Sequence, residues 1–322
     1  MEKKIKWGTL ILIAVLLCTY LAVHFFSGQK NDKLRLGYMP FASDLAIFIA
    51  KEKGYFDEEG LKIELIQFKS ATDNLNALLA GHIDAAGMIG FPTLFAAYEK
   101  DSTLFKIFLG TAETESKWAS AILIPPNSKL KNILELKGKI LGTYTGATQL
   151  LNLKSILQNN SINESDIKIR QVQSELQIPS LQSEQFDALF TIEPTVTIAL
   201  QKNIAKILVE NPRYKYIVQP FPVTANCVSV DYYKNNPEVI KKLYHALKRA
   251  TEDIRKNEEQ SKTFLTKYTP LADSLVKYVH LYYWWLPEDI NYNAIQKLAD
   301  IFTEQALLKS KINTKKMFLT IN

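Results

Sequence analysis

The chain has few residues that could form a disulfide or bind a metal. Only two of its 322 residues are cysteines, and Cys18 lies inside an apolar run near the start. One thiol, Cys227, is left for the remainder, which excludes an internal disulfide and a cysteine metal site. The four histidines are dispersed, without the spacing of zinc ligands. We therefore expect no metal and no cofactor.

Motifs of common catalytic sites are also missing. The sequence contains no G-x-S-x-G, no P-loop and no G-x-G-x-x-G. No histidine lies near Cys227 in the sequence, so nothing supports a role for this thiol as a nucleophile. These absences predict a protein that is not an enzyme.

Basic residues are in excess, with a formal net charge of +6, but they are not concentrated. The longest basic cluster is Lys3, Lys4 and Lys6, and no arginine stripe or aromatic RNA-binding motif occurs. Scattered lysines are typical of a solvated surface, so we expect no nucleic-acid partner. Hydrophobic residues make up 47% of the chain, which is enough to bury large cores without disulfides.

The first 32 residues resemble a targeting segment. Three lysines precede an apolar run from Leu10 to Phe26, which predicts a hydrophobic helix of roughly 25 Å. Because a basic start stays inside, the rest of the chain should face the periplasm or the outer side of the cytoplasmic membrane. An uncleaved membrane anchor, a cleaved signal peptide and a lipoprotein signal all stay open. Leu17 before Cys18 suits a lipoprotein poorly, and Phe25 suits a cleavage site poorly.

After residue 33, short β-type runs alternate with amphipathic helical segments. Leu34, Leu36 and Tyr38 alternate with charged residues or glycine, which predicts a strand. A helix is expected from Asp44 to Lys53, with Gly54 as its stop. Strands that alternate with helices predict parallel sheets with right-handed crossovers.

Part of this pattern recurs about 100 residues later. Three motifs return in the same order, at offsets of 105, 103 and 102 residues. The pairs are Leu36-Gly37-Tyr38 with Leu141-Gly142-Thr143, Ile83-Asp84-Ala85 with Phe186-Asp187-Ala188, and Phe91-Pro92-Thr93 with Glu193-Pro194-Thr195. The sequence thus indicates either an internal repeat or βα units that merely look alike. From Asn236 onward, the chain is expected to be mostly helical.

Ligands of parallel α/β sheets bind beyond the carboxyl ends of the strands, and two such sheets that face each other form a cleft. The candidate binding residues therefore lie in the loops after the predicted strands. They are Pro40, Phe41, Ser43, Ser70, Thr72, Gly90 and Phe91 in the first copy of the pattern, and Thr145, Gly146, Ala147, Thr148 and Glu193 in the second. Trp118 and Asn226, outside these loops, complete the set.

Several of these residues also have a structural interpretation. The segment from Thr145 to Thr148 exposes hydroxyls and backbone N–H groups to an anion or carbonyl, but it could also simply cap a helix. Glu193 could accept hydrogen bonds from an amine, or it could interact with a helix dipole. Trp118 would serve as an aromatic lid or as ordinary packing.

Several phrases of the sequence resemble one family, the nitrate/sulfonate/taurine-type ABC transporter substrate-binding proteins, which also include thiamine-pyrimidine binders. The similar phrases are A-K-E-K-G-Y-F-D-E-E-G-L-K-I-E-L from Ala50, A-L-L-A-G-H-I-D-A-A-G from Ala77, L-K-G-K-I-L-G from Leu136, I-E-P from Ile192, and N-N-P-E-V-I-K-K from Asn235. The resemblance covers about residues 33 to 265.

The resemblance implies a type II periplasmic-binding-protein fold. In this α/β fold, two lobes are joined by a hinge of two crossing strands, here near residues 119–124 and 224–230, after an N-terminal hydrophobic helix. We expect a signal peptide or membrane anchor at 1–32, a discontinuous lobe 1 at 33–118 and 225–322, and lobe 2 at 119–224.

The function implied is that of the extracytoplasmic solute-binding component of an ABC importer, with permease and ATPase subunits as partners and membrane contact through the N-terminal segment. The ligand stays open among sulfonate, nitrate, pyrimidine and amine, because only Lys69 and Lys117 are basic near the loops. An enzyme on the same fold, similar to a pyrimidine-synthesis enzyme, and a tethered ligand-sensing module are the alternatives.

Overall fold

The structure is a computed structural model, and it describes residues 33–320. The predicted N-terminal hydrophobic helix, and with it the question of cleavage or anchoring, lies outside these residues. Across residues 33–320, no helix combines the length and the apolar character needed to cross a membrane.

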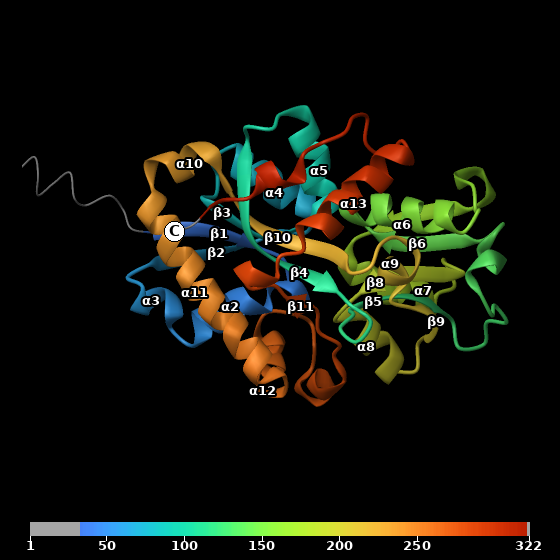
Figure 1. Cartoon of the computed structure of the whole chain (residues 1–322). Coiled ribbons are helices and arrows are strands. Elements are labelled where there is room, and N and C mark those ends of the chain that lie inside the picture. Colours follow the sequence, from blue (N-terminus) through green and yellow to red (C-terminus); the bar gives the residue numbers. More distant parts are fainter. Residues whose placement is uncertain (1–32, 321–322) are drawn as a thin grey trace, which may run out of the picture. The chain divides into compact units, whose positions relative to one another are not determined.

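The first of two sheets has six strands in the order β11-β4-β10-β3-β1-β2 (Figure 1). Its strands are β1 (Lys33–Tyr38), β2 (Lys62–Gln67), β3 (Ala85–Gly90), β4 (Phe105–Glu113), β10 (Phe221–Ser229) and β11 (Tyr283–Trp284). The prediction of parallel pairing is right for β1 and β3 and wrong for β10, which is antiparallel to both β3 and β4. The reason is that β10 enters from the second sheet rather than through a helical crossover.

The second sheet has five strands in the order β7-β6-β8-β5-β9. They are β5 (Ser120–Ile124), β6 (Ile140–Tyr144), β7 (Lys168–Val172), β8 (Ala188–Ile192) and β9 (Lys206–Glu210). Here β6 pairs in parallel with β7 and β8, whereas β5 is antiparallel to its neighbours. β5 and β8 are buried along their whole lengths and form the centre of this sheet.

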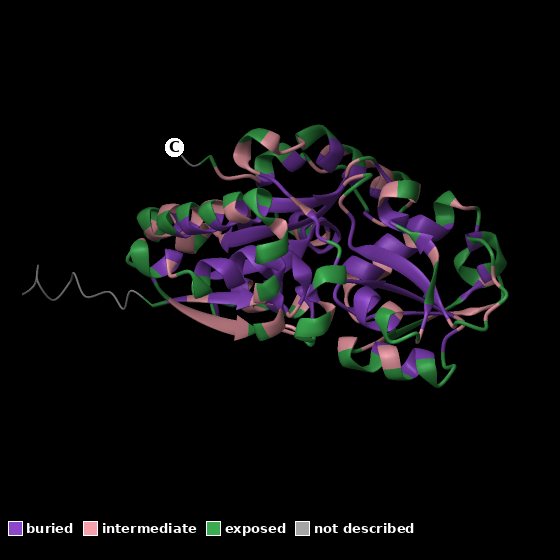
Figure 2. Cartoon of the chain, turned by 90° about the horizontal axis from the view of Figure 1, so that it is seen from below, coloured by how far each residue is buried: buried purple, intermediate pink, exposed green. Residues whose placement is uncertain are grey.

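Helices cover both sheets, and the buried residues lie between them (Figure 2). We call the first sheet with its helices lobe 1 and the second sheet with its helices lobe 2. The helices of lobe 1 are α2 (Leu45–Glu52), α3 (Tyr55–Glu58), α4 (Ala71–Leu79), α5 (Phe91–Lys100), α10 (Val230–Asn235), α11 (Pro237–Lys256), α12 (Glu258–Lys262) and α13 (Tyr292–Glu304). Those of lobe 2 are α6 (Ala147–Asn159), α7 (Gln177–Gln182), α8 (Thr195–Gln201) and α9 (Pro212–Tyr216).

Helix α11 shows how the sequence directs this packing. Pro237 occupies its first turn, where the missing N–H costs nothing, and Asn236 precedes it as the N-cap residue. Ile240, Leu243 and Leu247 recur at helical spacing on one face and are fully buried. That face packs on α2.

The recurring motifs occupy matching places in the two sheets. Leu36 of β1 pairs with Ala85 of β3, and Leu141 of β6 pairs with Ala188 of β8. Just before the third strand of each copy, an aspartate carboxylate accepts a backbone N–H from the first strand. Asp84 accepts from the N–H of Arg35 at 2.8 Å, and Asp187 accepts from the N–H of Ile140 at 2.7 Å. Matching register and matching hydrogen bonds favour an internal repeat.

Two segments connect the lobes. The chain leaves the first sheet after Glu113 and enters the second at Ser120, and it returns between Glu210 and Phe221. The crossings were expected near residues 119–124 and 224–230, but these residues belong almost entirely to β5 and β10, and both connections come before them in the chain. The assignment of 119–224 to lobe 2 stays a prediction, although β10 already pairs with β4 at Phe221.

A buried ion pair ties the two connections together. Arg213 of α9 donates from Nε and a terminal nitrogen to the Glu113 carboxylate at 2.8 and 2.7 Å. Glu113 also accepts the backbone N–H of Ala119 at 3.0 Å. Both side chains of the pair are almost fully buried, so the charges compensate each other out of contact with water.

Candidate functional site

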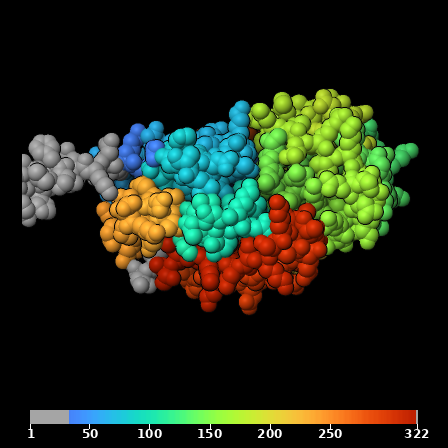
Figure 3. Space-filling view, turned by 90° about the horizontal axis from the view of Figure 1, so that it is seen from above, coloured from blue at the N-terminus to red at the C-terminus, as the bar shows by residue number. Residues whose placement is uncertain are grey.

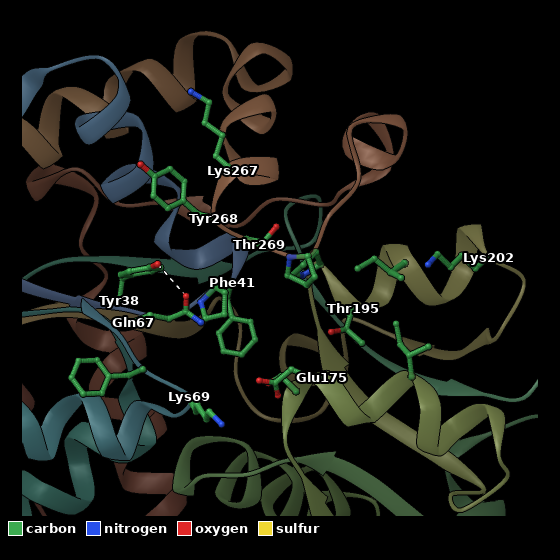
Figure 4. Close-up of a pocket in the computed structure, with 17 residues that line it drawn as sticks. Tyr38, Phe41, Gln67, Lys69, Glu175, Thr195, Lys202, Lys267, Tyr268 and Thr269 are labelled. Carbon is green, nitrogen blue, oxygen red and sulfur yellow. Dashed lines mark hydrogen bonds between the residues drawn. The ribbon is translucent and has the colours of Figure 1, made fainter. Parts of the chain in front are cut away.

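A cavity of about 520 Å³ lies where the strands of both sheets end (Figure 4). Residues after β1 and β2 form its lobe 1 side, and residues after β7 and β8 form its lobe 2 side. The segment from Lys267 to Pro270 closes a third side. The cavity therefore occupies the position expected for a ligand of two facing α/β sheets.

Aromatic rings give the cavity an apolar wall. Tyr38, Phe41, Phe68 and Tyr268 contribute to its lining. The ring of Tyr268 stacks on Phe48 with 4.4 Å between centroids, and Tyr38 meets Phe48 edge-on at 5.6 Å. This packing fixes the rings before any ligand arrives, so an apolar ligand surface would not have to order them.

The charged groups at the cavity rim are mostly basic. Lys267 is ion-paired with Glu52, and Lys69 donates to the Gln173 side chain at 3.4 Å, so it reaches lobe 2. Among residues 33–320, no hydrogen bond or ion pair holds the side chain of Lys202 or Glu175. These two groups are therefore available to a ligand or to water.

Of the candidate residues named from the sequence, Pro40 and Phe41 line the cavity. Ser70 instead caps α4, where its hydroxyl accepts the N–H of Asp73 at 3.1 Å. Ser43 is buried and donates to Asp44 at 3.3 Å. The remaining lobe 1 candidates, Thr72, Gly90 and Phe91, also lie outside the cavity lining.

The start of α6 contacts lobe 1. The Thr148 hydroxyl lies 2.8 Å from that of Thr93 in α5, and Gly90 leaves the space that the Thr148 side chain fills. Gly146 has a φ of 128°, which favours glycine, and its N–H donates to Gln171 at 3.1 Å. No side chain forms a capping hydrogen bond at the N-terminus of α6, so the residues from Thr145 to Thr148 do not serve as side-chain caps of this helix. Thr145, Gly146, Ala147 and Thr148 all lie outside the cavity lining.

Glu193 is fully buried, directly behind two residues that line the cavity, Pro194 and Thr195. Its carboxylate accepts the N–H and hydroxyl of Thr197 at 3.0 and 2.8 Å, and the N–H of His280 at 3.1 Å. Burial raises the pKa of this carboxyl group to about 7, although these hydrogen bonds oppose the change. All these partners belong to the protein, in line with the helix-start interpretation, and a ligand contact stays a prediction.

Trp118 and Asn226 also lie outside the cavity lining. The Trp118 ring stacks on His280 with 3.9 Å between centroids, at the first connection between the lobes. Asn226 lies in β10, and its side-chain oxygen accepts the N–H of Met88 at 3.2 Å. Ligand roles for both residues remain predictions.

Sequence reasoning missed much of the cavity lining. Tyr268 comes from a segment about 230 residues after β1, and no local pattern marks it as a binding residue. No sequence motif marks Ile178 or Ile198, which also line the cavity. Tyr38 was predicted as a strand residue, and its place at the carboxyl end of β1 is the one signal that indicated a site.

Residues 43–261 match one protein family, described as NMT1/THI5 like. The chain belongs to the NMT1/THI5-like family. Two curated relatives illustrate its range. A Bacillus subtilis (strain 168) protein assigned as an aliphatic sulfonates-binding protein is 28% identical over 211 residues, which span 63% of this chain and 62% of that protein. The Saccharomyces cerevisiae 4-amino-5-hydroxymethyl-2-methylpyrimidine phosphate synthase THI11 is 20% identical over 238 residues, 70% of this chain and 68% of that enzyme.

Similarity to solved structures confirms that this chain has the type II periplasmic-binding-protein fold. The alkanesulfonate-binding protein SsuA from Xanthomonas axonopodis pv. citri, bound to MOPS, gives a TM-score of 0.73 at 19% identity and covers 89% of this chain and 98% of its own. SsuA from Escherichia coli gives 0.70 at 20% identity, with 89% and 97% covered. The nitrate-binding protein NrtA from Synechocystis PCC 6803 gives 0.63 at 17% identity, with 76% and 69% covered.

Proposed function

We propose that this protein is the extracytoplasmic solute-binding component of an ABC importer. The observation that carries the proposal is the cavity of about 520 Å³ between the carboxyl ends of two sheets, lined from both lobes. Closure of the lobes around a solute would bury it, and opening by bending at the two connections would release it to a permease.

The size and lining of the cavity support an organic solute rather than a bare oxyanion. Its volume lies within the roughly 300–1,000 Å³ of pockets for small organic ligands. Much of its wall is aromatic or aliphatic, and a nitrate ion would leave most of that wall without contacts. We therefore favour a small molecule with an apolar body.

The partners and location belong to the same proposal. Permease and ATPase subunits of an importer would receive the solute. The relatives from Escherichia coli and Synechocystis are described as periplasmic, which supports a place outside the cytoplasm. Attachment to the membrane through residues 1–32 is part of the proposal, and fractionation of the full chain after a high-salt wash would test it.

The alternative is an enzyme, because four yeast relatives are named as synthases at 20% identity. The thiol of Cys227 would be a poor nucleophile, since it is fully buried in β10 and burial raises its pKa. Recovery of the bound molecule unchanged after prolonged incubation would favour a binding protein, whereas turnover would favour the enzyme. A sensing module would bind ligand equally well, and reconstituted transport would distinguish it from an importer component.

Thermal denaturation of the purified full chain, followed by calorimetry, tests the proposal. The probes are MOPS, short alkanesulfonates, aliphatic amides, 4-aminopyrimidine and nitrate. A ligand at about 100 times its Kd stabilises the native state by roughly 2.7 kcal/mol, which is a readily measured rise in Tm. Phe41→Ala, inside the cavity, should weaken binding, while Tyr98→Ala in the core of lobe 1 serves as the destabilised control that still binds. A panel that produces no rise in Tm and no heat would refute the proposal.

A further inference from the structure

Two polar groups are buried at the junction of the lobes without a partner. Tyr282 is 2% exposed, and its hydroxyl has no hydrogen-bond partner within residues 33–320. Gln149 is fully buried, and its side-chain oxygen likewise has none in that part of the chain. An unpaired buried polar group costs roughly 1–3 kcal/mol, so such groups call for a partner from outside the chain.

Tyr282 lies on the lobe 1 side of this junction. It immediately precedes β11, whose first residue, Tyr283, pairs with Ala112 of β4, next to Glu113. The Arg213 guanidinium lies 6.0 Å from the Tyr282 ring centroid. Because Arg213 uses Nε and one terminal nitrogen for Glu113, the phenol stands beside an ion pair whose charges already cancel.

Gln149 reaches the same junction from lobe 2. It lies in the first turn of α6, and its side-chain nitrogen donates to the Tyr144 hydroxyl at 2.7 Å. Helix α6 packs on α9, the helix that carries Arg213. Burial raises the pKa of both Tyr144 and Tyr282, and the charge of Arg213 opposes that rise in both phenols. The four residues thus form one cluster with contributions from each lobe.

The cluster adjoins the cavity through Phe41. The Phe41 ring lies 5.3 Å from the ring of Tyr144 and also lines the cavity. Phe41 follows β1 in a buried turn before α2, so it separates the apolar cavity from the polar cluster. Opening of the lobes or rotation of this ring would expose the polar cluster to the cavity.

We propose that Tyr282 and Gln149 bind the polar head group of the ligand beneath Phe41, one residue from each lobe, and that this head group is uncharged. The inference rests on the proposed function and specifies its ligand class. A charged head group would lose its hydration beside an ion pair that is already neutral, with no further counter-charge to offset the loss. A hydroxyl and an amide, by contrast, can each donate to or accept from an amide, an alcohol or the edge of a nitrogen heterocycle. The apolar body of the ligand would lie against the aromatic wall of the cavity.

The test compares two probes with similar bodies and different head groups, hexanamide and pentane-1-sulfonate, by calorimetry on the full chain. Wild type should bind the amide at least about tenfold more tightly than the sulfonate. Tyr282→Phe removes only the hydroxyl and should weaken amide binding about tenfold, and Gln149→Leu should do the same. Tyr283→Phe is the matched control. The Tyr283 hydroxyl accepts a hydrogen bond from Arg255 at 2.9 Å and does not belong to the cluster, so this variant should bind the amide as wild type does.

The unliganded protein gives an independent readout. Loss of an unpaired hydroxyl should leave the Tm of Tyr282→Phe unchanged or raise it, whereas a structural hydroxyl would lower it. A lowered Tm, or amide binding by Tyr282→Phe equal to that of wild type, would overturn the inference. If wild type bound the sulfonate more tightly than the amide, the inference of an uncharged head group would be wrong, while the proposed function would stand. A wild type that binds nothing in the wider panel would overturn both.

Discussion

The two repeats of the chain, β1 to α5 and β6 to α8, share a hydrogen bond to the backbone before the third strand but have different residues after it. In each, an aspartate before the third strand accepts a backbone N–H of the first strand. After that strand, the first repeat has Phe91, buried against Phe95, and the second has Glu193, buried among hydrogen-bond donors. Residues at the amino ends of the strands thus serve the fold in both copies, while residues at the carboxyl ends have diverged.

The segments that follow the two repeats differ in a complementary way. β4, which follows the first repeat, ends in Glu113, and α9, which follows the second repeat and β9, supplies Arg213, so one provides the carboxylate and the other the guanidinium of the buried pair. Glu193, by contrast, has no cation among its hydrogen-bond partners. Two buried glutamates at the same junction therefore depend on different kinds of compensation.

The largest effect should come from breaking the ion pair. Arg213→Met leaves the Glu113 carboxylate buried and uncompensated, which should cost about 3–5 kcal/mol of unfolding free energy. The double variant Arg213→Met with Glu113→Leu should recover most of that loss. Urea denaturation followed by circular dichroism measures both, and a single variant that loses less than about 1 kcal/mol would contradict the assigned role of the pair.

A change at Glu193 should alter the dependence of stability on pH. Its pKa is about 7 in the folded state and lies near 4.5 when exposed, so the folded protein holds this proton more tightly. The associated stabilisation is fully present below pH 4.5 and is lost as the pH rises through 7, by as much as about 3 kcal/mol.

Glu193→Gln should remove this loss. Unfolding free energies of wild type and variant, measured in urea at pH 4.5, 6 and 8, give the contribution of Glu193 as their difference. Burial lowers the pKa of His280, and its titration acts in the opposite direction in both proteins, so the difference cancels it. Parallel curves for the two proteins would show that Glu193 does not titrate in this range.

The shared aspartates should matter equally in both repeats. Asp84→Ala and Asp187→Ala each leave a backbone N–H without its acceptor, at a cost of roughly 1–3 kcal/mol. Asp84 also pairs with the Arg35 side chain, but that side chain is 38% exposed, so the pair adds little. Urea denaturation should give costs within about 1 kcal/mol of each other, with ligand affinity unchanged. A cost confined to one repeat would contradict the structural equivalence of the two aspartates.

The smallest effect concerns the contact between the repeats. Thr148→Ala removes the hydrogen bond to Thr93 and should favour the open form, with a loss of about tenfold in ligand affinity and less than about 1.5 kcal/mol in stability. Thr93→Ala should have the same effect from the other lobe. Calorimetry on the double variant should show no further loss, because the bond is already gone, whereas additive losses would indicate separate roles.

The sequence predicted those features of the fold that follow from local periodicity. Strand and helix patterns indicated the α/β alternation, and the repeat indicated two similar sheets. The antiparallel insertion of β10 was not predicted, because pairing between residues more than 100 positions apart leaves no local pattern. The candidate residues coincide with the cavity lining only where a loop directly follows a strand, at Pro40 and Phe41. Tyr268 and the cluster around Arg213 depend on the closure of the lobes and on the return of the C-terminal segment.

That C-terminal segment also links the lobes on the surface. The side-chain amide of Gln305 donates to Asn159 at the end of α6, at 2.8 Å, and Figure 3 shows the C-terminal residues in red against both lobes. This contact lies outside the cavity lining, so the relative position of the lobes also depends on residues that no loop motif identifies.

The position of β10 has a consequence for how the chain acquires its structure. β10 forms the only bridge between β3 and β4 in the first sheet of the described chain, and it comes more than 100 residues after both of them. Until it arrives, β3 and β4 present unpaired edges, which other chains can join. Synthesis or passage through a membrane from the N-terminus would therefore expose these edges while lobe 2 is already forming. Slow emergence of residues 125–220 should increase aggregation, and a chaperone that holds extended strands should reduce it.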